Sequence, residues 1–218
     1  MSKLIVKDLE GPASSSNKIY IASGSQLDIA GSPGGAAAIN LAVDGSDITS
    51  GTLANARLAA GHILQVVTVV KSDILLMNQA ADTYTTFMTG AITPSSTSNH
   101  ILIFINVCFS GDEARYANIH LYRDSTQIGQ GDSAGSRTRT TVAANSDGSS
   151  DAQHNNFNSS MTFKDSPSST SAISYTLRAG SVNAPSSNQL MINSSGDNVD
   201  SGYTMASISN LILMEVKG

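Results

Sequence analysis

The sequence predicts an all-β protein: an antiparallel sandwich preceded by an extended segment. Apolar runs rich in β-branched and aromatic residues recur from residue 61 onward. Turn signals separate these runs every ~8–12 residues, the spacing typical of sandwiches. No stretch has a convincing helical period, so crossover helices are not expected and neighbouring strands should run antiparallel.

The most apolar run, residues 101–109, is predicted to be the central strand. It is too short to cross a membrane as a helix, and it is bounded by turn residues. Apolar side chains occupy both alternating sets, so we expect burial on both faces, mid-sheet in a sandwich or against a neighbouring subunit. Cys108, the single cysteine, lies in this run and is expected to be a buried, inert thiol.

Composition excludes several classes of protein. Charged residues are 13% of the chain, well below the usual quarter. A surface made polar by hydroxyls and amides suits a structural particle better than a cytosolic enzyme. The net charge of −5 gives no reason to expect nucleic-acid or anionic-membrane binding, and we expect no membrane insertion. The N-terminus has no apolar core typical of a secretory signal.

Residues 1–60 are predicted to form an extended segment rich in glycine, serine and alanine. Their large apolar residues are too few to offset the roughly 1–2 kcal/mol per residue of backbone ordering. Either the segment is a flexible tail, or it gains burial by wrapping around copies of itself or docking on a larger body. Ile48, Leu53 and Leu58 are spaced by five, which favours a tight threefold spiral over a turn-rich linker.

Residues 61–218 are predicted to form the sandwich domain. We expect strands, in chain order, at residues 64–71, 74–77, 83–93, 101–109, 119–123, 126–129, 158–164, 173–178, 190–192 and 208–216. A hairpin turn at Asp124 should join the fifth and sixth of these.

The first and last strands of this domain are as apolar as the middle one. An exposed apolar edge would invite aggregation, so we expect these two strands to pair. The pattern resembles the jelly-roll trimers of the tumour necrosis factor and complement globular-head type. That resemblance implies that the sheet with both terminal strands faces a threefold axis, with Val66, Leu211 and Leu213 in the interface. Aspartate at Val66 or Leu213 should then break the trimer.

A long polar segment between residues 129 and 154 is either a solvated loop, the plainer interpretation, or a binding tip. If it is a tip, Arg137 and Arg139 are candidate contacts with an acidic or sugar partner, together with Asn145, Asp147 and Asp151.

No set of catalytic or ligand-binding residues is evident in the sequence. The four histidines lack the spacing of a metal site, and neither a nucleophile elbow nor a phosphate-binding loop is present. The carboxylate pairs, Asp112–Glu113 and Asp147 with Asp151, fall in loops. We therefore expect no enzymatic activity, no cofactor and no metal.

Several segments resemble structural proteins of tailed bacteriophages. They are the Ile-Thr-Pro-Ser-Ser-Thr-Ser turn at 92–98, the entry at 61–67, Leu-Tyr-Arg-Asp at 121–124, Asp-Ser-Pro at 165–167 with the following strand, and the closing Leu-Met-Glu-Val at 213–216. Residues 47–58 similarly resemble a motif of trimeric tail fibres. Asn106 and Cys108 depart from the pattern, because they make the central strand less apolar.

The resemblance implies a virion protein without an enzymatic site. We expect a homotrimeric tail fibre or spike subunit that attaches to other virion proteins through residues 1–60 and binds a host-surface receptor or glycan. The alternative is a capsid decoration or cement protein, or a tail adaptor, with a purely structural role.

Overall fold

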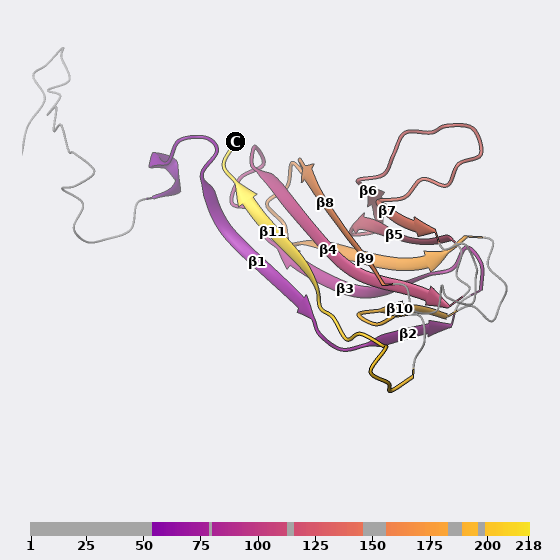
Figure 1. Ribbon diagram of the computed structural model, residues 1–218. Helices are drawn as coiled ribbons and strands as arrows, with labels where there is room; N and C mark the ends of the chain where they lie inside the picture. Colours follow the sequence, from indigo (N-terminus) through magenta and orange to yellow (C-terminus); the bar gives the residue numbers. More distant parts are fainter. Residues whose placement is uncertain (1–53, 79, 113–115, 146–155, 183–188, 196–198) are drawn as a thin grey trace, which may run out of the picture. The chain divides into compact units, whose positions relative to one another are not determined.

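The computed structural model describes residues 54–78, 80–112, 116–145, 156–182, 189–195 and 199–218. These contain one 3-10 turn, η2 (Asn55–Arg57), and eleven strands (Figure 1). The strands are β1 (Ile63–Lys71), β2 (Leu75–Asn78), β3 (Tyr84–Ile92), β4 (His100–Asp112), β5 (Tyr116–Arg123), β6 (Thr126–Ile128), β7 (Val142–Asn145), β8 (Phe157–Asp165), β9 (Ile173–Ser181), β10 (Gln189–Ile192) and β11 (Ser209–Val216).

The chain divides into two compact units, Met1–Thr52 and Leu53–Gly218. The first unit lies outside the described residues, so the predicted extended segment remains a prediction. The second begins earlier than the predicted boundary at residue 61. Lys217 explains why: its Nζ donates to the carbonyl oxygens of Asn55 and Leu58, and its own carbonyl accepts from the Gly61 amide at 2.8 Å.

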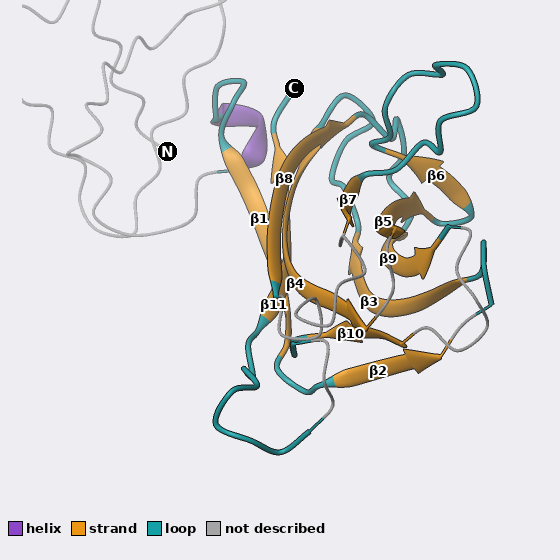
Figure 2. Cartoon of the chain, turned by 45° about the vertical axis from the view of Figure 1, so that its right-hand side comes forward, coloured by secondary structure: helices purple, strands orange, loops and turns teal. Residues whose placement is uncertain are grey.

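Two antiparallel sheets pack face to face (Figure 2). In the first, β8 and β11 pair with opposite sides of β4, β1 pairs with β11, and β10 and β2 extend the far end. In the second, the order is β3, β9, β5, and then β6 and β7 end to end along β5. The chain crosses repeatedly between the sheets, as in other antiparallel β-sandwiches.

The predicted fold class is confirmed, including the pairing of the first and last strands. β1 pairs with β11 from Ile63–Val216 to Lys71–Ser209. Each predicted strand corresponds to an observed one within a few residues at its ends. β7 was not predicted, because its sequence, Val-Ala-Ala-Asn, has only one large apolar residue.

The core lies between the sheets and is centred on β4. Ile101, Ile103, Ile105, Val107 and Phe109 face inward and are buried. The prediction that this strand is buried on both faces is wrong within one chain. On its other face Cys108 and Ser110 are buried, whereas Leu102, Phe104 and Asn106 are half-buried, because no second layer among the described residues covers that side.

A buried carboxylate, Glu215, ties together the two ends of the domain. Its oxygens accept hydrogen bonds from Gln65 at 2.6 Å, from the amide and hydroxyl of Ser95 at 2.6 and 2.8 Å, and from Asn99 at 2.6 Å. Burial alone raises the pKa of Glu215, but these hydrogen bonds outweigh burial and lower its pKa below the ordinary value. Three of the motif segments therefore meet at one buried charge.

A second buried carboxylate joins two more of these segments. The Asp165 carboxylate forms an ion pair with Arg123, whose Nη1 lies 2.8 Å from Oδ1, and its Oδ2 accepts a hydrogen bond from the hydroxyl of fully buried Tyr175 at 2.7 Å. Burial, followed by the hydrogen bond to Asp165, raises the pKa of Tyr175 well above its ordinary value. The motif residues at these two carboxylates thus stabilise the fold.

Candidate functional site

The outer face of the second sheet carries a strip of polar and aromatic side chains. Alternation along β5 places Ala117, Ile119 and Leu121 in the core. The intervening residues, Tyr116, Asn118, His120 and Tyr122, therefore point away from the core. Asn118 and His120 are nonetheless buried, because neighbouring strands and the following loop surround them.

Tyr84 of β3 lies across β9 and stacks on His120. The ring centroids are 4.1 Å apart and the planes differ by 22°. Gly180 of β9 makes this path possible, since a Cβ there would lie 2.7 Å from the Tyr84 ring and 2.4 Å from the Thr83 carbonyl oxygen. Neither ring nitrogen of His120 has a hydrogen-bond partner among the described residues, and burial lowers the pKa of His120.

Arg178 completes the strip from β9. It pairs across the ladder with His120, and its guanidinium carbon lies 4.0 Å from the centroid of the Tyr122 ring. This is the geometry of a cation–π contact. The rings and the guanidinium of this face thus pack on one another.

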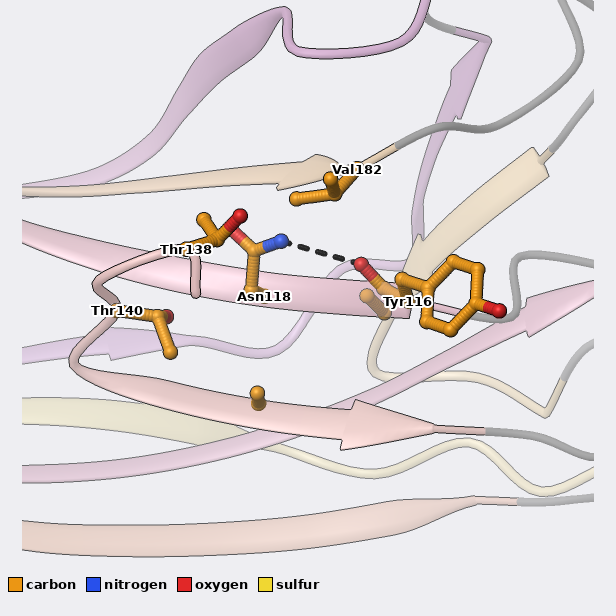
Figure 3. A pocket seen from close by; sticks show the side chains of 7 residues that line it. Tyr116, Asn118, Thr138, Thr140 and Val182 are labelled. Atoms are coloured by element: carbon orange, nitrogen blue, oxygen red, sulfur yellow. Dashed lines mark hydrogen bonds between the residues drawn. The ribbon is translucent and has the colours of Figure 1, made fainter. Parts of the chain in front are cut away.

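A pocket of about 330 Å³ opens at one end of this strip, between β5, β7 and the loop that joins β6 to β7 (Figure 3). Seven of the described residues line it, and none of these carries a charge: Tyr116, Ala117, Asn118, Thr138, Thr140, Ala143 and Val182. The side chain of Asn118 is 3% exposed, and its Nδ2 donates to the Tyr116 carbonyl oxygen at 3.1 Å. Its Oδ1 has no partner among the described residues.

The loop beside the pocket, residues 129–141, projects from the sandwich (Figures 1 and 2). Arg139, one of the predicted contact residues, donates to the Gly131 carbonyl oxygen at 2.6 Å, and Arg137, the other, donates to that of Ala134 at 3.2 Å. At the loop's end, the Thr140 hydroxyl donates to the Ile119 and Val142 carbonyl oxygens. Both arginines thus brace the loop while lying on its exposed surface.

The other predicted contact residues are not brought together with these arginines among the described residues. Asn145 is the last residue of β7 and pairs with Tyr116, whereas Asp147 and Asp151 lie outside the described residues. Sequence reasoning missed the residues that line the pocket. The polar and aromatic residues at alternate positions of β5 were a signal that the sequence offered. The pairing of β5 with β7, which completes the pocket, could not be read from the sequence.

The outer face of the first sheet is different in character. Six apolar side chains from three neighbouring strands lie side by side on it, and we call them the apolar outer face: Val66 and Val70 of β1, Leu102 and Phe104 of β4, and Ile212 and Met214 of β11. Val66 is 51% exposed and Val70 is 58% exposed.

The structure does not place all the predicted interface residues in the same environment. Leu211 and Leu213 are fully buried in the core of one chain, so the prediction that they meet another subunit is wrong. Their neighbours Ile212 and Met214 point outward instead. Val66 lies on the outer face, as the predicted role requires, and Leu58 is half-buried at the end of η2. Ile48 and Leu53 lie outside the described residues.

Within the described part of the chain, no three histidine, cysteine, aspartate or glutamate side chains are grouped so that they could hold a metal ion. Nor does that part contain a helix long and apolar enough to span a membrane. In comparisons with known proteins, no family model matches the sequence, and no curated protein matches it significantly.

Proposed function

We propose that the protein is a homotrimeric structural subunit of a virus particle, a tail fibre or spike of a tailed phage, whose jelly-roll head binds a host-surface glycan. The single observation that supports assembly best is the apolar outer face. A contiguous apolar patch on a folded domain marks an interaction surface; here Val66 and Val70 are more than half exposed and the other four side chains are half-buried. This one lies on the sheet that holds both terminal strands.

The occupant that fits this face is a second copy of the chain. Among the described residues no acidic side chain belongs to this face, and one lysine, Lys164 of β8, borders it opposite Leu102. Asn106, also on this face, has a buried Oδ1 without a partner among the described residues. A neighbouring copy would supply both apolar cover and a donor for this oxygen.

The outer face of the second sheet, with the strip formed by Tyr84, Tyr116, Asn118, His120, Tyr122 and Arg178, is called the polar outer face. It supports a role in recognition. It carries a neutral pocket next to a projecting loop, which is the composition of a site for an uncharged polar ligand. Three such heads on one particle would strengthen weak contacts by avidity. Residues 1–60 would attach the subunit to other virion proteins.

A decoration or cement protein, or a tail adaptor, is the second candidate. The observation that favours it is the internal hydrogen bonding of Arg137 and Arg139, because these side chains brace the loop as a mechanical part would require. Such a protein would form the same trimer and bind no receptor.

Antibody labelling of intact particles, combined with an adsorption assay, separates the two candidates. The proposal predicts label on the tail and inhibition of adsorption by the purified full-length protein. Label on the capsid faces, with no effect of the purified protein on adsorption, would contradict the fibre proposal and support the decoration protein. Sedimentation as a monomer at micromolar concentration would contradict both.

A further inference from the structure

We infer that the pocket between β5, β7 and the 129–141 loop binds an N-acetylhexosamine residue of a glycan. The inference deepens the proposed function, because it names the ligand class of the head. The inference rests on three observations of the described residues: one buried acceptor without a partner, the apolar groups around that acceptor, and a pocket lining without charge.

The acceptor is Asn118 Oδ1. Its side-chain amide is held in place, because Nδ2 donates to the Tyr116 carbonyl oxygen at 3.1 Å. A buried carbonyl oxygen without a donor is unfavourable, and a ligand N–H or O–H that reaches it would remove the penalty. The pocket therefore selects a ligand with a hydrogen-bond donor, and an amide N–H meets this requirement.

The groups around this acceptor are largely apolar. Ala143 pairs with Asn118 across the β5–β7 ladder, and Val182 follows the end of β9 on the other side. The Thr140 hydroxyl is engaged by two carbonyl oxygens, which leaves its methyl group for packing. An acetamido group matches these neighbours. Its N–H can donate to the acceptor, and its methyl group, a few bonds away, can pack against the apolar groups.

Tyr116 is suited to hold the sugar ring itself. It is 46% exposed and lines the pocket on the outer face of β5. The C–H face of a pyranose packs on an aromatic ring, which buries apolar surface without disturbing the sugar hydroxyls. Thr138, on the loop side of the pocket, adds a hydroxyl that can donate to or accept from these groups.

The charge and the volume of the pocket further limit which sugars fit it. None of the described lining residues is charged, so an acidic sugar would find no cation among them to pair with its carboxylate. The volume of about 330 Å³ lies at the small end of ligand pockets, which suits one sugar residue of a chain. A plain hexose lacks the methyl group and the amide donor, so it should bind less well.

Ligand-detected NMR and calorimetry on the full chain test this inference. The probes are oligomers of N-acetylglucosamine and of N-acetylgalactosamine, with glucose and galactose oligomers and sialyllactose for comparison. We expect at least one N-acetylated oligomer to bind more tightly than its plain counterpart by about tenfold, equivalent to one good contact. Equal binding of plain and N-acetylated sugars, or binding of sialyllactose alone, would overturn the inference.

Ala143→Phe is the decisive variant, because Ala143 is exposed and a phenyl ring there would fill the pocket without entering the core. Ala91→Phe is the matched control, since Ala91 is an exposed alanine on the same outer face at the far end of β3. We expect Ala143→Phe to weaken binding by about tenfold or more and Ala91→Phe to leave it within about twofold. Unchanged binding by Ala143→Phe would overturn the inference.

The two proposals fail separately. If the protein is trimeric and blocks adsorption, but Ala143→Phe has no effect on sugar binding, the pocket inference is wrong and the proposed function stands. If the pocket binds the sugar as expected, but the protein neither assembles nor affects adsorption, the proposed function is wrong and the pocket inference stands.

Discussion

The two outer faces of the sandwich belong to different sheets that share the same alternation of inward and outward side chains, but they differ in what the outward side chains contact. On the second sheet, Tyr84, His120, Tyr122 and Arg178 pack on one another, so that His120 is only 5% exposed. On the first sheet, Val66 and Val70 remain more than half exposed. The alternation of side chains along the strands therefore determines which residues form the core. The identity of the outward residues determines how much of each outer face stays exposed.

Polarity explains the difference between the faces. Rings and a guanidinium can satisfy one another within a single sheet through stacking and cation–π contacts. Aliphatic side chains on a flat face cannot remove themselves from water in this way, and only another surface can cover them. The rings and the guanidinium of the polar outer face therefore cover one another within one chain, although Asn118 and His120 keep buried polar atoms without partners among the described residues. The side chains of the apolar outer face stay partly exposed instead.

The largest effect is expected from Leu213→Asp. This residue is fully buried between the sheets, so the variant places an unpaired carboxylate in the core. The loss should be several kcal/mol, a large part of the roughly 5–15 kcal/mol that stabilises a typical domain, and the head should unfold. Circular dichroism and urea denaturation measure it. A folded Leu213→Asp head that has merely lost assembly would show that Leu213 faces outward after all.

Gly180→Ala should have the next largest effect and tests the polar outer face. The new Cβ would lie 2.4 Å from the Thr83 carbonyl oxygen and 2.7 Å from the Tyr84 ring, so the stacked arrangement must shift. We expect a loss of about 1–3 kcal/mol in the free energy of unfolding. Gly131→Ala is the control, since nothing lies within 4 Å of a Cβ there. Equal stability of the two variants would contradict the described path of Tyr84.

Arg178→Ala should weaken the same face by less. It removes the guanidinium that lies 4.0 Å from the centroid of the Tyr122 ring, a contact that contributes about 1 kcal/mol in partly exposed settings. Arg137→Ala, at the exposed loop, should change the free energy of unfolding by much less. Chemical denaturation of the two variants measures the difference. If Arg137→Ala destabilises the head more than Arg178→Ala does, the cation–π contact contributes little to this face.

The smallest effect is expected from pH. The pKa of His120 is lowered by burial from its ordinary 6.5, so at pH values between the folded and ordinary pKa the unfolded chain binds more protons than the folded one. The free energy of unfolding should therefore fall as the pH drops below about 6.5. His120→Phe, which keeps a ring for stacking, should flatten this slope, and His62→Gln, at an exposed site, should not. A slope that persists unchanged in His120→Phe would rule out His120 as its cause.

Acidification should act again at lower pH through Glu215. Its folded pKa lies below the ordinary 4.5, so its contribution is present above 4.5 and is lost as the pH falls through the folded value. The two pH ranges therefore separate the contribution of His120 to the free energy of unfolding from that of Glu215. In Glu215→Gln the loss of stability in the lower pH range should disappear, and its persistence would assign it to another group.

The sequence predicted the sandwich because its strands are marked by apolar runs, and it missed β7 because alanines carry little signal. It could not decide which face of β11 is the inner one. Leu211 and Leu213 alternate with Ile212 and Met214, so both faces are apolar, and only packing against the second sheet distinguishes them. The pocket was out of reach for a related reason: Asn118, Ala143 and Val182 are distant in sequence, and strand pairing brings them together.

Assembly of copies of the chain through the apolar outer face is best tested by sedimentation of Ile212→Asp. Ile212 lies next to fully buried Leu213 but points outward, so the variant should keep its fold while placing a charge on that face. Thr89→Asp, at an exposed position of the second sheet, is the control. We predict a trimer for the wild type and for Thr89→Asp, and a folded monomer for Ile212→Asp. A trimeric Ile212→Asp protein, or a monomeric wild type, would contradict assembly through this face.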